Sequence, residues 1–119
     1  MSQNFQAGDF LIFQIESGYG LLRLLAVEEI NGETIWHLAA YNELFLDVEM
    51  ADMALTNPQG LTISIPHVAL TNRAFLSTQT ARMSNLHLNE SELTELKAWQ
   101  ADQTAEISDR SIRLLLGLR

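Results

Sequence analysis

The chain has 119 residues, no cysteine and a net charge of −8. The lack of cysteine excludes a disulfide scaffold, a thiol nucleophile and cysteine-ligated metal sites. The acidic balance argues against a nucleic-acid binder, which needs Lys and Arg to displace counterions from phosphates. The length and the 47% apolar content are typical of one globular domain, so we expect residues 1–119 to form a single domain.

The N-terminus has no basic segment followed by an apolar core, so it does not resemble a secretory signal. No apolar run approaches the ~20 residues that a membrane-spanning helix needs. The sequence therefore predicts a cytoplasmic protein with no membrane partner.

The first 41 residues indicate three strands. Residues 10–15 are aromatic and aliphatic and follow Gly8-Asp9, and residues 21–30 form a second apolar stretch after a glycine turn at 17–20. Asn31-Gly32 then stands between apolar runs, which is typical of a two-residue hairpin with positive φ at both positions. With residues 34–41 as the returning strand, we predict a three-stranded antiparallel meander.

The middle of the chain is less distinct. Apolar and polar residues alternate over 42–55, which favours a strand, but the spacing of Leu46, Met50 and Met53 also fits a helix. Residues 61–65 alternate cleanly and predict a strand that ends at Pro66. Residues 67–76 are expected to form a further strand after that break.

The C-terminal part indicates helices. Asn89 is a suitable N-cap and Glu92 occupies the capping-box position. The apolar stripe of Leu93, Leu96 and Trp99 predicts a helix to about residue 103. The tail, 107–119, fits a helix capped by Ser108 or Asp109 and ended by Gly117, or else a strand.

These elements predict an α+β fold: a small bent antiparallel sheet over about 8–76, an SH3-like partial barrel, with a helical part over about 89–119 packed on it. A sheet that does not close leaves free strand edges, which can pair between chains. A homodimer is therefore a further expectation.

No motif for catalysis is present. The glycines at 18 and 20 lack the third glycine and the lysine of a phosphate-binding loop, and no Gly-x-Ser-x-Gly elbow occurs. We interpret His37 as a half-buried sheet residue, His67 as a loop residue and His87 as a connector. We therefore predict no catalytic residues and no cofactor, and favour a non-enzymatic role.

The acidic residues are concentrated in one part of the chain. Between Leu24 and Asn72 there are seven carboxylates and no Lys or Arg: Glu28, Glu29, Glu33, Glu43, Asp47, Glu49 and Asp52. Three interpretations fit: a solvated face, a docking surface for a basic partner, or a metal site of Asp47, Glu49 and a histidine. The solvated face is the simplest of the three, and we predict no metal.

If this region docks a partner, six residues are the candidates for contact. Four are acidic, one is an aromatic side chain expected at an exposed turn, and one is an arginine flanked by apolar residues: Glu43, Asp47, Glu49, Asp52, Tyr19 and Arg73. The alternative for Arg73 is an ion pair with Asp47, Glu49 or Asp52. Arg23, in the middle of a strand, has the same two interpretations.

Residues 7–27 resemble the start of small bacterial immunity proteins of the SH3-like barrel type, which neutralise the polymorphic toxins of competing bacteria. The similarity rests on Gly8-Asp9 and the strand after it, and on the run from Gly18-Tyr19-Gly20 to Arg23. Leu22 stands where a glycine is expected.

The resemblance implies a barrel fold and a toxin partner. Together with the acidic region it predicts a non-enzymatic, immunity-like inhibitor of a basic toxin. A regulatory or small-ligand-binding module on the same barrel is the alternative.

Overall fold

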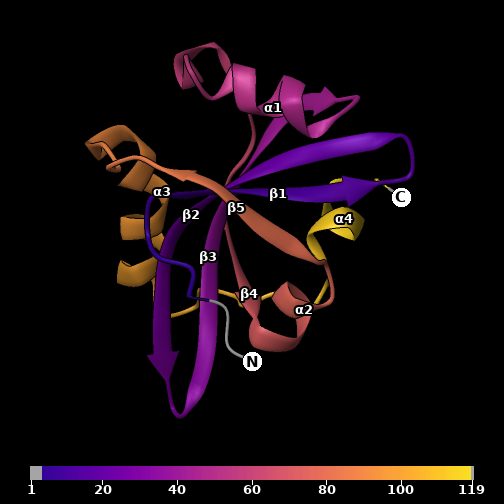
Figure 1. The fold of residues 1–119 in the computed structure, drawn as a ribbon. Helices are drawn as coiled ribbons and strands as arrows, with labels where there is room; N and C mark the ends of the chain where they lie inside the picture. The colour runs from indigo at the N-terminus through magenta and orange to yellow at the C-terminus, as the bar shows by residue number, and fades with distance from the viewer. Residues whose placement is uncertain (1–3, 119) are drawn as a thin grey trace.

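The computed structural model describes residues 4–118 and shows an α+β fold built on one antiparallel sheet (Figure 1). Its strands are β1 (Asp9–Ile15), β2 (Gly18–Ile30), β3 (Glu33–Phe45), β4 (Ile63–Thr71) and β5 (Thr80–Asn85). Its helices are α1 (Val48–Ala54), the 3-10 turn η1 (Pro58–Gly60), α2 (Asn72–Leu76), α3 (Glu90–Ala101) and α4 (Ile112–Leu115). Within the described residues no helix is long and apolar enough to cross a membrane.

The strand order is β4-β3-β2-β1-β5, so the predicted meander of the first three strands is confirmed. The hairpin between β2 and β3 has positive φ at Asn31 (52°) and at Gly32 (82°). This is the conformation that a two-residue turn of the expected type requires.

The sheet is open, with β4 and β5 at its two edges, and its topology requires a strong bend. In a flat sheet these two edge strands would lie about 19 Å apart, which is four inter-strand spacings of about 4.8 Å. Only residues 72–79 connect them, and five of these residues form α2, which advances about 1.5 Å per residue. The connection also has to cross a face of the sheet, so the edges must curl toward each other.

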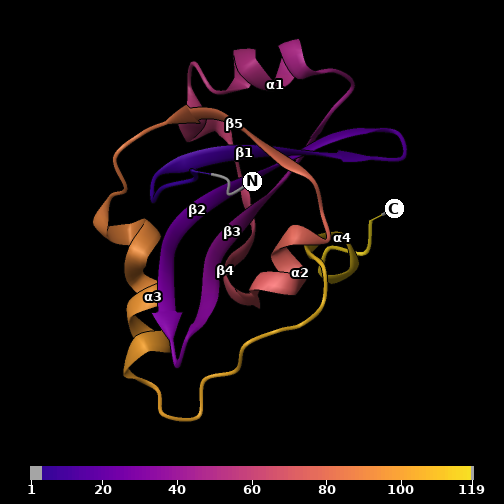
Figure 2. The ribbon, with the colours of Figure 1, turned by 60° about the horizontal axis from the view of Figure 1, so that its bottom comes forward.

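The inner face of the bend carries the main core. α2 and α4 cover it, and Trp36 stacks on Phe75 of α2 with the ring centroids 4.1 Å apart. Both views place α2 and α4 on the opposite side of β2 and β3 from α3 (Figure 2). The other buried residues of this face come from all of the first four strands and from α2 and α4: Leu11, Phe13, Ile15, Leu22, Leu24, Leu38, Ala40, Leu70, Ala74 and Ile112.

The outer face is covered at two separate places. α1 packs Ala51 near Phe10 and Leu21, whereas α3 packs Leu96 near Leu25 and Ala39. Between these two contacts lie Arg23 and Tyr41, whose side chains belong to the same face. The candidate site described below is built around this interval.

Several sequence predictions need correction. Residues 42–55 are neither all strand nor all helix, because β3 continues to Phe45 and α1 follows it. Strand β4 runs through Pro66, and the expected strand over 67–76 is divided between the end of β4 and α2. β5 extends the sheet to Asn85, beyond the predicted limit of 76.

The predictions for the C-terminal part are confirmed except for the cap of the last helix. Asn89 caps α3 with the full capping box that Glu92 completes. The tail forms the short helix α4, as one of the two alternatives predicted, but its cap is Ser111. Ser108, one of the expected caps, instead forms a bridge to Leu70 at the edge of β4.

Candidate functional site

The acidic candidates gather around α1, but they play different local roles. Asp47 is the N-cap of α1, and its carboxylate accepts a 2.8 Å hydrogen bond from the backbone N–H of Met50. Glu49 lies in the first turn, and Asp52 lies one turn later on the exposed surface. The first turn of a helix favours negative charge, so Asp47 and Glu49 also stabilise α1. Asp47 and Glu49 do not share a strand face as the metal hypothesis required.

Glu43 ties the end of β3 to the segment before β4. Its carboxylate accepts hydrogen bonds from the backbone N–H of Thr62 (2.8 Å) and from the Thr62 hydroxyl (2.6 Å). Burial alone would raise the pKa of Glu43, but these hydrogen bonds outweigh it and hold the pKa below its usual value. Glu43 is therefore a structural carboxylate as well as part of the acidic surface.

The other two candidates lie elsewhere. Tyr19 is half-buried at the start of β2 and packs on the core under α1, so it is not the exposed turn residue that was expected. Arg73 lies on α2, on the opposite side of the sheet, and forms an ion pair with Asp109. The expected ion pair of Arg73 with the acids at 47, 49 or 52 is wrong.

The apolar side chains that surround the α1 carboxylates were not among the residues predicted from the sequence. Leu46 is 77% exposed and Met53 is 72% exposed, and Met50 beside them is half-exposed. Leu46 immediately precedes the cap, at a position whose side chain often folds back onto the helix. The helical spacing of these three residues is the signal for this surface in the sequence, where it competes with the strand-like alternation of residues 42–55.

Two networks of buried polar side chains stabilise the outer face of the sheet. Arg23 is 1% exposed, lies over the ring of Phe10 (4.2 Å to the centroid), and binds Glu92 of α3 through Nε (2.8 Å) and Nη2 (3.3 Å). Its remaining contacts are to the carbonyl oxygens of Gly8 and His87. The arginine thus joins β2 to α3 and is fully engaged in the fold.

The second network is a chain of histidines. His37 is fully buried rather than half-buried as predicted, and His67 lies in strand β4 rather than in a loop. His37 Nε2 lies 2.6 Å from Glu28 Oε1. Because a carboxylate only accepts, His37 Nε2 carries the proton, and His37 Nδ1 accepts from His67 Nε2 at 2.9 Å. Trp99 of α3 packs against both imidazole rings. Burial lowers the pKa of His37, and it lowers the pKa of His67 to about 4.

No three His, Asp or Glu side chains among residues 4–118 are arranged to hold a metal ion. The structure therefore brings no histidine to Asp47 and Glu49.

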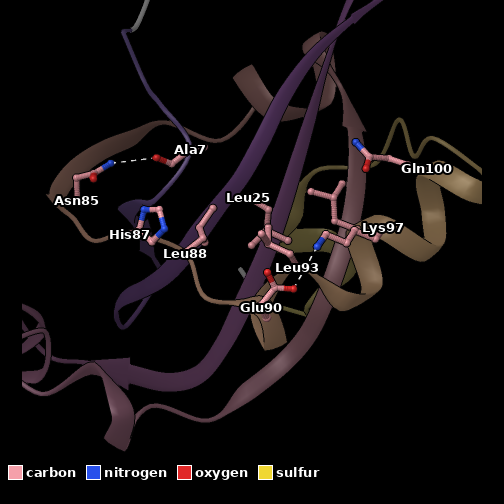
Figure 3. Close-up of a pocket in the computed structure, with 10 residues that line it drawn as sticks. Ala7, Leu25, Asn85, His87, Leu88, Glu90, Leu93, Lys97 and Gln100 are labelled. Atoms are coloured by element: carbon pink, nitrogen blue, oxygen red, sulfur yellow. Dashed lines mark hydrogen bonds and ion pairs between the residues drawn. The ribbon is translucent and has the colours of Figure 1, made fainter.

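A groove of about 580 Å³ runs between α3 and the chain that leads to it (Figure 3). Its floor is apolar, with Leu25, Leu88 and Leu93. Two of the polar groups at its rim are already engaged: Lys97 pairs with Glu90 at 3.3 Å, and Gln100 donates to Glu28. This groove offers little polar recognition.

No family model, curated protein or solved structure matches this chain.

A cleft beside Tyr41 is a better candidate for a binding site than the groove along α3. Two adjoining cavities, of about 130 and 410 Å³, share Tyr41, Ile63 and Glu92 in their walls. They occupy the interval between the α1–η1 segment and the N-terminus of α3. The molecule thus presents two features on this side: the cleft and the exposed surface of α1.

Proposed function

We propose that the protein is a non-enzymatic, bacterial-type protein-binding domain that docks a basic protein through the α1 surface. The α1 surface comprises the exposed apolar residues Leu46, Met50 and Met53 together with Glu49 and Asp52. The observation that carries the proposal is this combination: strongly exposed apolar side chains next to carboxylates, in a stretch of chain that contains no Lys or Arg.

Apolar and acidic groups contribute to binding in different ways. Clustered exposed apolar side chains mark interaction sites, and flexible methionines adapt to a partner's surface. The carboxylates steer a basic partner during encounter and raise the association rate. Salt weakens this attraction, because at 0.1–0.15 M ionic strength charges more than about 8–10 Å apart are largely screened. We therefore expect the acids to act mainly on the association rate and the apolar residues mainly on the dissociation rate.

The similarity of residues 7–27 to immunity proteins supports a more specific version, in which the partner is a basic toxin and the protein is its inhibitor. A cytoplasmic location belongs to the same proposal. The toxin version adds one requirement to general protein binding, namely that the complex suppresses the toxin's activity.

The first test is comparative capture from lysate of the native cell at low and moderate salt. The baits are the wild-type protein, the double variant Leu46→Ser/Met53→Ser, and the control Leu114→Ser. Leu114 is also strongly exposed, at 62%, but belongs to α4 on the other side of the sheet. We expect one basic protein to be retained by wild type and control, to be lost by the double variant, and to weaken with salt.

The second test uses the retained protein in purified form. The variant Glu49→Gln/Asp52→Asn should lower the association rate and flatten its dependence on salt, while the dissociation rate changes little. Equal capture by the double variant and the wild type would refute the α1 surface. If nothing is retained at either salt concentration, the small-ligand alternative becomes the better explanation.

A further inference from the structure

The cleft beside Tyr41 contains an unused polar group. Tyr41 is only 8% exposed, yet its hydroxyl has no hydrogen bond to any of the residues 4–118. Its side chain borders both cavities of the cleft. The hydroxyl oxygen is not itself fully buried, so it is accessible from the cavities and free to form a hydrogen bond with a ligand group.

The smaller cavity has walls of two kinds. Four apolar side chains line it, and they come from three different strands: Leu25, Ala39, Ile63 and Pro66. Its polar groups are the Tyr41 hydroxyl, Ser91 and two glutamates of α3. A long aliphatic stem with a polar end would satisfy both kinds of wall.

The charge at the polar end favours a cation. Glu92 is neutralised by Arg23, with an Oε2–Nε distance of 2.8 Å. Glu95 has no ion pair with any described residue, and no Lys or Arg lines the smaller cavity. Burial raises the pKa of Tyr41 to about 12, so its hydroxyl stays neutral and can accept a hydrogen bond from a cation.

The size of the cavities distinguishes a side chain from a whole small molecule. Pockets for small-molecule ligands usually measure about 300–1,000 Å³, and the smaller cavity, at about 130 Å³, is well below that range. The adjoining cavity of about 410 Å³ is large enough for the short peptide segment that carries the side chain. Its walls include the loop after α1, so the cleft continues from that helix.

We propose that the smaller cavity is an anchor site for a lysine or arginine side chain of the partner protein. The cationic group binds between the Tyr41 hydroxyl and the Glu95 carboxylate, and the methylene stem packs on Ile63 and Pro66. The inference rests on the proposed function in requiring a basic protein partner. It adds a second contact, separate from the α1 surface, that selects for one cationic side chain.

The test is an NMR titration of the full chain with two capped tripeptides, acetyl-Gly-Lys-Gly-amide and the same peptide with norleucine in place of lysine. Norleucine keeps the stem and removes the charge. The lysine peptide should shift the signals of Tyr41, Ile63, Ser91 and Glu95, with a Kd of roughly 1–10 mM, as expected for so few contacting atoms. The norleucine peptide should bind at least about tenfold more weakly, because hydrogen bonds to a charged group are the stronger kind.

Matched variants test the two polar contacts. Tyr41→Phe keeps the ring and should raise the Kd for the lysine peptide about tenfold, and Glu95→Gln should raise it about threefold. Tyr19→Phe and Glu106→Gln make the same chemical changes away from the cleft and should leave the Kd unchanged. The inference is wrong if norleucine binds as well as lysine, or if Tyr41→Phe binds as wild type does.

Two further measurements separate the alternatives. Free butane-1,4-diamine should bind no more tightly than the lysine peptide, and micromolar binding of the diamine would make the cleft a small-molecule site and overturn the proposed anchor. The variant Leu46→Ser/Met53→Ser should bind the lysine peptide as wild type does. Failure of the peptide titration therefore leaves the test of the α1 surface intact, and failure of the α1 test leaves the titration intact.

Discussion

The buried histidine pair should make the protein lose stability in mild acid. The pKa of His67 lies at about 4 in the folded protein against an ordinary value of 6.5, chiefly because its ring is buried and also because His37 is close. Between these two pH values the unfolded chain binds a proton that the folded protein does not, so folding becomes less favourable as pH falls. The stabilisation is complete above pH 6.5 and is lost as pH falls toward 4.

The size of the effect follows from the shift. Each pKa unit corresponds to about 1.4 kcal/mol, so the full difference for His67 corresponds to about 3 kcal/mol. The ring is partly exposed, and water screens part of this effect. We therefore expect a loss of about 1–2 kcal/mol in the free energy of unfolding between pH 7 and pH 4.5.

The assay is urea unfolding at pH 7.0, 6.0, 5.0 and 4.5, followed by circular dichroism, for wild type and His67→Gln. The structural carboxylates Asp9, Glu43 and Glu92 have pKa values below their ordinary 3.8–4.5, so they add little above pH 4.5. His67→Gln should show a shallower pH dependence than wild type by about 1–2 kcal/mol over this range. Identical pH dependence in the two proteins would refute the assignment of the acid sensitivity to this pair.

Three further predictions concern stability, each measured by chemical unfolding at pH 7. Glu92→Gln leaves the buried Arg23 guanidinium without its carboxylate and should cost about 2–4 kcal/mol. Asn89→Ala removes the N-cap of the longest helix and should cost about 1 kcal/mol, with a loss of helical signal on heating. Gly20→Ala places a methyl group 2.5 Å from the ring of Phe13 and should cost about 1–3 kcal/mol; an unchanged stability would show that the ring can move aside.

Local signals in the sequence predicted the elements that depend on local physics. Asn31-Gly32 predicted its hairpin because only a few residue pairs accept two positive φ values in succession. Asn89 and Glu92 predicted the start of α3 because the capping box is formed by residues three positions apart. The α+β class followed from these elements.

Elements that depend on distant contacts were not predictable in the same way. β5 is short and polar, and it exists because it pairs with the edge of β1 about 70 residues earlier in the chain. Pro66 stops an interior strand but is tolerated here because β4 is an edge strand. The partners of Arg23 and Arg73 lie on α3 and beside Ser108, which no spacing in the sequence indicates.

The features of the candidate site were likewise predictable where they depend on local sequence and not where they depend on distant contacts. The charge imbalance between residues 24 and 72 was visible in the sequence and indicated the acidic surface. Leu46 and Met53 are exposed because Ala51 is on the face of α1 that packs against the sheet. The cleft exists because α1 and α3 cover the outer face of the sheet at two separate places. Tyr41 alternates in a strand like any core residue, so nothing in the sequence distinguished it.

The strand order also has a consequence for how the protein folds. β1 to β4 follow one another in the chain and in the sheet, with two-residue turns between the first three strands and residues 46–62 between β3 and β4, whereas β5 must cross from the β4 edge and pair with β1. Residues 16–79 separate β1 from β5 in the chain. Closing so long a loop costs entropy and slows folding relative to local pairing. We expect a four-strand intermediate in which Asp9, normally bound by Arg82 and Asn85 of β5, is still in water. Amide hydrogens of β5 should accordingly be the last in the sheet to become protected during refolding.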